Sequence, residues 1–135
     1  MPDVTDRPAQ QQTTADFRWH HCASVDEMHE FYLSRLPAIR EAARECGYAI
    51  GLHGSTLRDL DLIAVPWIKD AETKDALAGA IHRAACGLHR PRYEWEAKPC
   101  GRLATSFPIC WTEWDGCYGI PNLGHIDLSV MGPQA

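Results

Sequence analysis

The sequence predicts an α/β (α+β) fold, formed by a single domain of ordinary size for a chain of 135 residues. Two segments repeat apolar residues every three or four positions, as amphipathic helices do, and others alternate apolar and polar residues, as half-buried strands do. Hydrophobic residues make up 45% of the chain and charged residues 23%, which allows a core without disulfide bonds. We expect residues 1–16, which are rich in Gln, Thr and Pro, to form a disordered polar tail, and residues 17–135 to form the domain.

The first expected helix covers about residues 24–46. Ser24 followed by Glu27 fits a capping box, in which the two side chains satisfy amides of the first turn. Gly47 is well placed to end this helix. Pro37 lies inside it and removes a backbone hydrogen bond, so it predicts a break or bend. The expected apolar face consists of Met28, Tyr32, Leu36, Ile39, Ala43 and Cys46.

A second helix is expected over about residues 72–86, because apolar residues recur at helical spacing there and Gly87 follows. Strands are expected over residues 48–52, 59–65, 93–97, 103–111 and 125–130. The Gly, Pro and Asn cluster between Asp115 and Gly124 predicts a long loop.

Charge and hydropathy limit the kinds of partner. The formal net charge of −5 provides no global basic field for duplex nucleic acid. A metal ion that bridges carboxylates to phosphates would still let an acidic protein bind a nucleotide. Neither a signal peptide nor an apolar run of membrane-spanning length is evident, so we expect a cytoplasmic protein and no membrane partner.

The six cysteines are interpreted as reduced thiols, because a chain with this apolar content does not need disulfides. Structural zinc is the alternative, although no CxxC pair is present and zinc sites usually have tighter spacing. The simpler interpretation is small, partly buried side chains. The candidate zinc groupings are His82, Cys86 and His89, and Cys100, Cys110 and Cys117 with His125.

Two aspartates in one predicted strand are the strongest candidates for metal ligands. Asp59 and Asp61 are two positions apart, so both carboxylates lie on one face of the strand, with Cα atoms about 6.6 Å apart. Carboxylates held this close repel one another unless a cation or a proton lies between them. A hard divalent ion such as Mg²⁺ takes oxygen ligands of this kind.

A third aspartate lies in the last predicted strand. Ile126, Leu128 and Val130 alternate with Asp127 and Ser129, so the apolar residues face a core and Asp127 faces the opposite side. If this strand neighbours the one with Asp59 and Asp61, three carboxylates converge. They would then hold one or two Mg²⁺ ions, the second partly through phosphates of a bound nucleotide.

The turn before the first aspartate is a candidate phosphate-binding loop. Gly54 permits a tight turn close to a ligand, Ser55 offers an amide and a hydroxyl, and Arg58 can pair with a phosphate oxygen. The alternative is an ordinary hairpin tip with a surface arginine.

Several other residues have both a functional and an ordinary interpretation. Lys98 and Arg102 can reach phosphates across the site, but we expect them to be solvent-exposed turn charges. His53 is a possible base or ligand, although a histidine beside such a turn is more often simply hydrogen-bonded. Four tryptophans can stack on a nucleobase or pack at the rim of the core: Trp67, Trp95, Trp111 and Trp114.

The series G-S-x-x-R, D-h-D-h and h-D-h, where h is a hydrophobic residue, resembles the nucleotidyltransferase superfamily, including its minimal antitoxin-type and DNA polymerase β-like members. The resemblance rests on residues 54–61 and on Asp127, and the same pattern is similar to small phage and prophage proteins. It implies a mixed β-sheet flanked by helices, and Mg²⁺ or Mn²⁺ held by Asp59, Asp61 and Asp127. It also implies transfer of a nucleoside monophosphate from a nucleoside triphosphate to a hydroxyl of an unknown protein or nucleic-acid acceptor, with Asp127 assisting the attack.

One departure from the family pattern leaves other functions open. Only Thr56, Leu57 and Arg58 separate Ser55 from Asp59, whereas family members usually have a longer segment there, often with a short helix whose N-terminus faces the triphosphate. One alternative is therefore a catalytically inactive module of phage origin that binds a nucleotide or a protein. Another is an α/β domain in which the three aspartates never converge.

Overall fold

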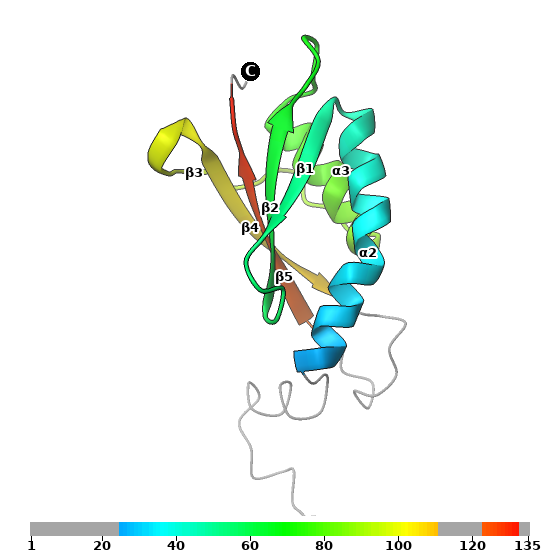
Figure 1. Cartoon of the computed structure of the whole chain (residues 1–135). Coiled ribbons are helices and arrows are strands. Elements are labelled where there is room, and N and C mark those ends of the chain that lie inside the picture. Colours follow the sequence, from blue (N-terminus) through cyan, green and yellow to red (C-terminus); the bar gives the residue numbers. More distant parts are fainter. Residues whose placement is uncertain (1–24, 111–122, 133–135) are drawn as a thin grey trace, which may run out of the picture.

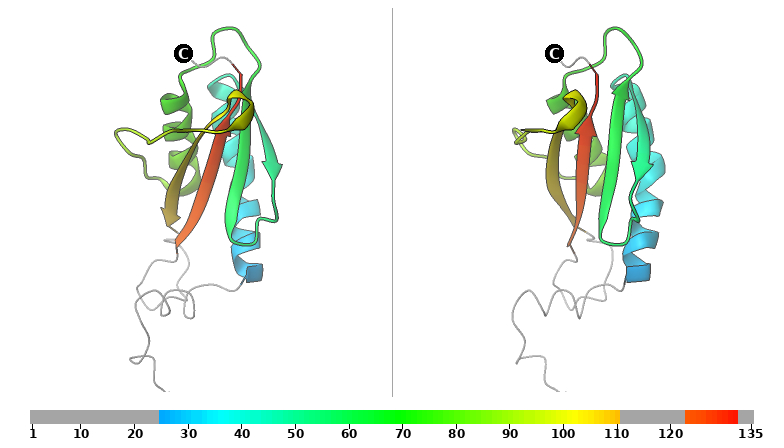
Figure 2. Two further views of the ribbon diagram at one scale, coloured as in Figure 1. Left: turned by 90° about the vertical axis from the view of Figure 1, so that its left-hand side faces the viewer. Right: turned by 60° about the vertical axis from the view of Figure 1, so that its left-hand side comes forward.

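The computed structural model describes residues 25–110 and 123–132. They form two helices and a five-stranded mixed sheet, which is an α+β architecture. Both helices lie on one side of the sheet, and within these described ranges no helix covers the opposite face (Figures 1 and 2). The predicted mixed sheet flanked by helices is therefore confirmed. The expected tail (1–16), the capping residue Ser24 and most of the expected 115–124 loop lie outside the described residues.

The sheet has the strand order β1-β2-β5-β4-β3. The central strands β2 and β5 are parallel, and the other three neighbouring pairs are antiparallel. The last strand in chain order thus lies in the middle of the sheet. The elements are α2 (Val25–Glu45), β1 (Tyr48–His53), β2 (Asp59–Pro66), α3 (Lys74–Cys86), β3 (Glu96–Ala97), a 3₁₀ turn (Pro99–Gly101), β4 (Leu103–Cys110) and β5 (Leu123–Val130).

Of the break or bend predicted at Pro37, the break does not occur, because helix α2 runs without interruption through this residue. Pro37 and Leu33, four residues earlier, are both exposed. The lost hydrogen bond therefore lies on the solvent-exposed side of the helix, where water can replace it. Gly47 ends the helical segment as predicted, with a φ of +92°. A Cβ at this position would lie 2.8 Å from the Ile68 side chain, so only glycine fits.

Helix α3 has the predicted end, Gly87, and begins at Lys74, two residues after the expected start. The Thr73 side chain accepts a hydrogen bond of 3.2 Å from the amide of Ala76, which caps the N-terminus. Gly87 adopts the left-handed conformation, and its amide donates to the Arg83 carbonyl.

The strand expected over residues 93–97 is shorter, because only Glu96–Ala97 pair with β4. Tyr93 is buried in the core instead. Its hydroxyl lies 3.0 Å from the Arg90 amide and 3.0 Å from Nδ1 of His82, a residue of α3. The segment before Glu96 is therefore held against the helical layer and is not free to extend the sheet.

The core lies between the two helices and one face of the sheet. Alternate residues of the central strands point into it and are fully buried, including Leu60 and Leu62 of β2 and Ile126 and Leu128 of β5. Residues of opposite parity in the same strands face away from the helices. The sheet therefore presents positions 59, 61 and 127 on its uncovered face. Neither described helix is long and apolar enough to span a bilayer.

Candidate functional site

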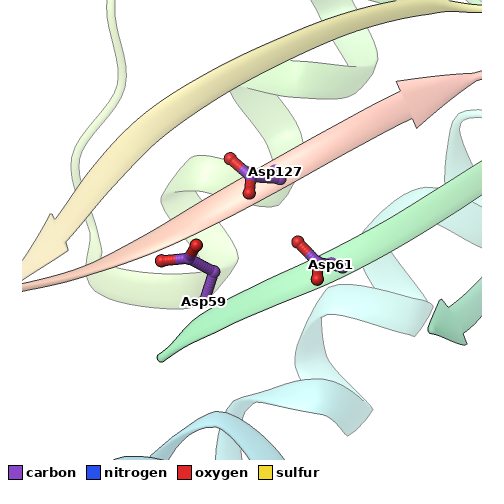
Figure 3. A group of neighbouring side chains, drawn as sticks. All are labelled: Asp59, Asp61 and Asp127. Carbon is purple, nitrogen blue, oxygen red and sulfur yellow. The ribbon is translucent and has the colours of Figure 1, made fainter. Parts of the chain in front are cut away.

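Three carboxylates meet on the uncovered face of the sheet. The parallel register places Asp61 directly opposite Asp127, and Asp59 opposite His125. One carboxylate oxygen from each of Asp59, Asp61 and Asp127 lies within 4.8 Å of the other two. Figure 3 shows the three side chains gathered above β2 and β5. The predicted convergence is confirmed, and the alternative in which these aspartates lie apart is wrong.

Strand pairing places two further polar residues in line with Asp61 and Asp127, one on each of the neighbouring strands. His53 of β1 lies opposite Asp61, and Ser106 of β4 lies opposite Asp127. The Ser106 hydroxyl donates a hydrogen bond to Oδ1 of Asp127 and thereby orients that carboxylate. His53 is exposed. Ser106 was not among the predicted site residues, because its position beside Asp127 depends on strand pairing between distant segments.

The crowding of carboxylates changes the protonation of Asp61. Burial, a hydrogen bond with Asp127 and the charge of Asp127 raise the pKa of Asp61 from 3.8 to about 6, while His53 opposes the shift. The negative charge of Asp59 adds a smaller increase to the Asp61 pKa. The folded protein therefore disfavours the charged form of Asp61 when no cation is bound.

The three aspartates are the only group of three or more His, Cys, Asp or Glu side chains within residues 25–110 and 123–132 that is arranged to share a metal ion. The zinc alternative therefore finds no support in this part of the chain. His82 is buried, and its ring nitrogens lie 3.0 Å from the Tyr93 hydroxyl and 3.0 Å from the Pro108 carbonyl. Cys46, Cys86, Cys100 and Cys110 are free thiols, and Cys117 lies outside the described residues.

The turn that carries Gly54 packs directly against the aspartates. Gly54 has a φ of +80°, and a Cβ there would lie 2.5 Å from Oδ2 of Asp61. Glycine is therefore required both by the backbone conformation and by the space that the Asp61 carboxylate occupies. Any larger residue would push this carboxylate out of the cluster.

The rest of this turn is closed by hydrogen bonds within the protein. The Ser55 hydroxyl accepts from the Leu57 amide at 3.3 Å. Thr56 is buried in a left-handed conformation (φ +58°), and its hydroxyl donates to the Ser55 carbonyl and lies 2.5 Å from Nδ1 of His29. The Arg58 side chain is exposed. The predicted phosphate-binding residues therefore lie beside the carboxylates, but two of the polar groups in the turn are already paired.

Tyr32 of α2 supports the site from the helical side. Its buried hydroxyl donates to the Arg58 carbonyl at 2.5 Å and accepts from the His125 amide at 3.1 Å. It therefore joins the start of β2 to β5, next to Asp59 and Asp127. Burial, with a contribution from the charges of all three aspartates, raises the pKa of Tyr32 to about 12. The sequence predicted Tyr32 only as an apolar position, since helical spacing does not show where a hydroxyl ends.

A cavity of about 580 Å³ lies next to Asp61 and Asp127 on the uncovered face. Lys98 and Arg102 line it. Arg102 is half-buried, so the expectation of a solvent-exposed turn charge is wrong for this residue, whereas the Lys98 side chain is 38% exposed. Gly54, Ser55 and Arg58 are not part of its lining. The remaining lining includes Arg90, Glu94, Trp95, Glu96 and Ser129.

The predicted tryptophans have different environments. Trp95 lines the cavity, and its Nε1 donates to Oδ1 of Asp75 at 2.8 Å, so the ring is fixed in place. Trp67 is 60% exposed and lies apart from the cavity lining. Trp111 and Trp114 lie outside the described residues.

No protein-family model, curated protein or solved structure matches this chain. The site is therefore interpreted from its own geometry: a carboxylate cluster, a glycine turn packed against it and an adjoining cavity with basic side chains.

Proposed function

We propose that this chain is a metal-dependent, nucleotidyltransferase-like protein. It would transfer a nucleoside monophosphate from a nucleoside triphosphate to a hydroxyl of an acceptor still to be identified. The observation that carries this proposal is the meeting of Asp59, Asp61 and Asp127 within 4.8 Å on two adjacent parallel strands. A Gly-Ser turn packed against Asp61 adds support.

The residues of the cluster fit a hard divalent cation, Mg²⁺ or Mn²⁺. All three donors are carboxylate oxygens, which such ions prefer. The raised pKa of Asp61, caused by burial and by Asp127, reflects a repulsion that a cation would relieve in place of a proton. Bound there, the cation would neutralise charge on the phosphates and on the attacking oxygen during transfer.

In the proposed reaction, the acceptor hydroxyl oxygen attacks the α-phosphorus and forms a new phosphorus–oxygen bond. The bond between the α-phosphorus and the oxygen that bridges it to the β-phosphorus breaks, and pyrophosphate leaves with the electron pair. The hydroxyl proton passes to the carboxylate of Asp127, which Ser106 orients through its hydrogen bond. Asp59 and Asp61 complete the set of ligands.

A second candidate is a binding module that holds a nucleotide or a protein partner without turnover, as in an inactive protein of phage origin. The short turn favours it: only Thr56, Leu57 and Arg58 separate Ser55 from Asp59, and no helix forms there. The turn therefore lacks the amides that a helix N-terminus would offer a triphosphate. Ser55 and Arg58 are the phosphate contacts that the sequence predicts for either candidate, and the Arg58→Gln variant described below tests them. The free thiols Cys46, Cys86, Cys100 and Cys110 suit a cytoplasmic location, where nucleoside triphosphates are abundant.

Thermal unfolding with Mg²⁺ or Mn²⁺ and each nucleoside triphosphate tests ligand binding. A ligand that binds only the folded state stabilises it by about 2.7 kcal/mol at one hundred times its Kd. We expect a stabilisation that requires metal and is lost in Asp61→Ala. Asp70→Asn, a change of an exposed aspartate outside the cluster, is the matched control and should behave like the wild type. No stabilisation with any combination would contradict the proposal.

Transfer itself is tested with nucleoside triphosphates labelled at the α-phosphate. Label that becomes covalently attached to protein or RNA with the wild type, and not with Asp127→Asn, would support the nucleotidyltransferase. Metal-dependent nucleotide binding without any transfer would support the binding module instead.

A further inference from the structure

The cavity beside the aspartates has a basic wall on the side away from the Gly54 turn. Arg102 and Lys98 come from the connection between β3 and β4, and Arg90 comes from the segment after α3. Figure 1 shows the β3–β4 hairpin, in yellow, projecting on the side of the sheet opposite the helices. The carboxylate cluster therefore lies between this basic wall and the Gly54 turn.

Arg102 is fixed in place while most of its donors stay unused. One guanidinium nitrogen donates to the Ser129 hydroxyl at 2.9 Å, two positions along β5 from Asp127. In the part of the chain that the structure describes, this is the only hydrogen bond of the side chain, and no carboxylate pairs with it. A guanidinium carries five N–H donors, arranged to bind carboxylate or phosphate in a fork. A half-buried arginine with spare donors beside a cavity is suited to an anionic ligand.

The backbone around Lys98 and Arg102 is tightly constrained. The Lys98 amide donates to the Arg102 carbonyl at 2.9 Å. Between them, Cys100 and Gly101 both have positive φ angles, of 68° and 74°. Such a turn brings the two basic residues to neighbouring positions at the end of the β3–β4 hairpin. Lys98 also forms an ion pair of 3.3 Å with Glu96, so Arg102 is the stronger free cation of the two.

The Gly54 turn offers less to a phosphate chain than this wall does. Its Ser55 hydroxyl and Leu57 amide are bonded to each other, and the Thr56 hydroxyl is directed to the Ser55 carbonyl. The Arg58 side chain is exposed and does not line the cavity. An exposed arginine in water contributes much less to binding than a half-buried one.

The charges that line the cavity imply that anion binding depends on metal. Three basic side chains face four acidic ones, namely Asp61, Glu94, Glu96 and Asp127. A divalent cation held by Asp59, Asp61 and Asp127 would add two positive charges and remove the net negative charge of the site. Phosphates would then bridge the cation and Arg102.

We propose that the phosphate groups of the nucleotide bind in this cavity, with Arg102 as their principal protein ligand and Lys98 as a weaker one. The Gly54 turn then serves to pack Asp61 and not to hold the phosphates. The identity of the ligand as a nucleoside triphosphate rests on the proposed function. The position of the phosphate subsite rests on the cavity alone.

Isothermal titration of the whole protein with inorganic tripolyphosphate, in the presence and absence of Mg²⁺, tests the subsite directly. We expect Mg²⁺-dependent binding that weakens about tenfold or more in Arg102→Gln and about threefold in Arg102→Lys, which keeps the charge but loses the fork. Lys98→Gln should also weaken binding about threefold, since its ammonium is shared with Glu96. Arg40→Gln, at an exposed arginine outside the cavity lining, is the control and should stay close to the wild type. Arg58→Gln compares the two candidate phosphate positions, and it should weaken binding less than Arg102→Gln does if the phosphates bind in the cavity. Thermal unfolding of each variant verifies that it is folded, and Arg102→Lys tests the residue if Arg102→Gln is not.

Two results would overturn this inference: no Mg²⁺-dependent binding of tripolyphosphate by the wild type, or binding lost in Arg58→Gln and kept in Arg102→Gln. Replacing tripolyphosphate with ATP, CTP, GTP and UTP separates the two phosphate sources. Tighter binding of a nucleoside triphosphate, with the same dependence on Arg102, identifies the nucleotide as the ligand. Nucleotide transfer with an unchanged KM in Arg102→Gln would leave the proposed function standing and refute the subsite. Binding that depends on Arg102, without any nucleotide transfer, would support the subsite and contradict the proposed function.

Discussion

The two faces of the sheet are built from the same strands and differ in their residues: one is apolar and buried, and the other is uncovered and carries carboxylates. In β2, Leu60, Leu62 and Ala64 face the helices and are fully buried, whereas Asp59, Asp61 and Ile63 face the uncovered side and are partly exposed. The buried face joins the sheet to α2 and α3 through dispersion and loss of apolar surface to water. The uncovered face gathers carboxylates whose mutual repulsion works against folding unless a ligand compensates. The residues that stabilise the fold and those that form the candidate site are therefore separated by one position along each strand.

The largest expected difference between the faces concerns neighbouring residues of β2. Leu62→Ala on the buried face should lower the free energy of unfolding by about 3 kcal/mol, because it leaves a cavity in a closed core. Ile63→Ala on the uncovered face, where the side chain is partly exposed, should cost about 1 kcal/mol or less. Urea denaturation of both variants gives the comparison. Similar losses of unfolding free energy in the two variants would show that another part of the chain packs against the uncovered face.

A smaller effect is expected for Tyr32, which reaches from the helical layer to the edge of the site. Tyr32→Phe should cost about 2 kcal/mol, because it leaves the Arg58 carbonyl and the His125 amide without their partner. Tyr48→Phe is the matched control: it removes a single hydrogen bond, to the Glu72 carbonyl, and should cost about 1 kcal/mol. The same denaturation experiment measures both. Equal costs would mean that the Tyr32 hydroxyl contributes no more than a single hydrogen bond does.

Asp61→Asn should stabilise the metal-free protein at neutral and alkaline pH. Burial and Asp127 raise the pKa of Asp61 from 3.8 to about 6, so the folded state favours the protonated form. Its contribution to stability is fully present below pH 3.8 and is lost as the pH rises through about 6. The full shift corresponds to about 3 kcal/mol, which solvent screening of this partly exposed carboxyl reduces to about 1 kcal/mol.

The measurement is thermal unfolding of wild type and Asp61→Asn in chelator, from pH 4 to pH 8. The difference in stability between the two proteins should be close to zero at pH 4 and should grow between pH 4 and pH 6. Saturating Mg²⁺ should reverse the order at pH 8, because only the wild type then gains from the ion. A difference that does not change with pH would contradict the assigned titration.

The smallest expected effect concerns the β3–β4 turn. Cys100 is not a glycine and yet adopts the left-handed conformation. Cys100→Gly should therefore stabilise the fold by about 0.5 kcal/mol, since the steric relief slightly exceeds the entropy that glycine loses on folding. Cys86→Gly, in the last turn of α3, should destabilise instead. Differential scanning calorimetry resolves both signs, and a destabilised Cys100→Gly would show that the thiol itself has a packing role.

Short-range patterns were sufficient to predict most elements and the three aspartates. The alternation in residues 59–65 and 125–130 determines which side chains share a face, and capping chemistry determines where α3 ends. These features depend on a few consecutive residues. Pro37 misled the prediction because its cost depends on whether the freed carbonyl reaches water, and this depends on packing.

The remainder of the site depends on contacts between distant segments. Ser106 reaches Asp127 only because β4 pairs with β5, and the Tyr32 hydroxyl bonds an amide 93 residues away. Arg102 is half-buried, and both Lys98 and Arg102 border a cavity that residues of β2 and β5 also line. No local pattern contains this information, so the sequence predicted the carboxylate cluster without the groups that orient and surround it.

The central position of β5 also determines the order in which the molecule can be assembled. During synthesis β1, β2 and β4 emerge first, but β2 and β4 do not pair with each other and must wait for β5 to insert between them. Pairing across such long sequence separations is slow, and unpaired strand edges are prone to aggregate in the meantime. Asp127 arrives with that same strand. A nascent chain therefore gains its complete set of carboxylates only when β5 pairs with β2 and β4. Metal binding at this site would then occur only after the sheet has formed.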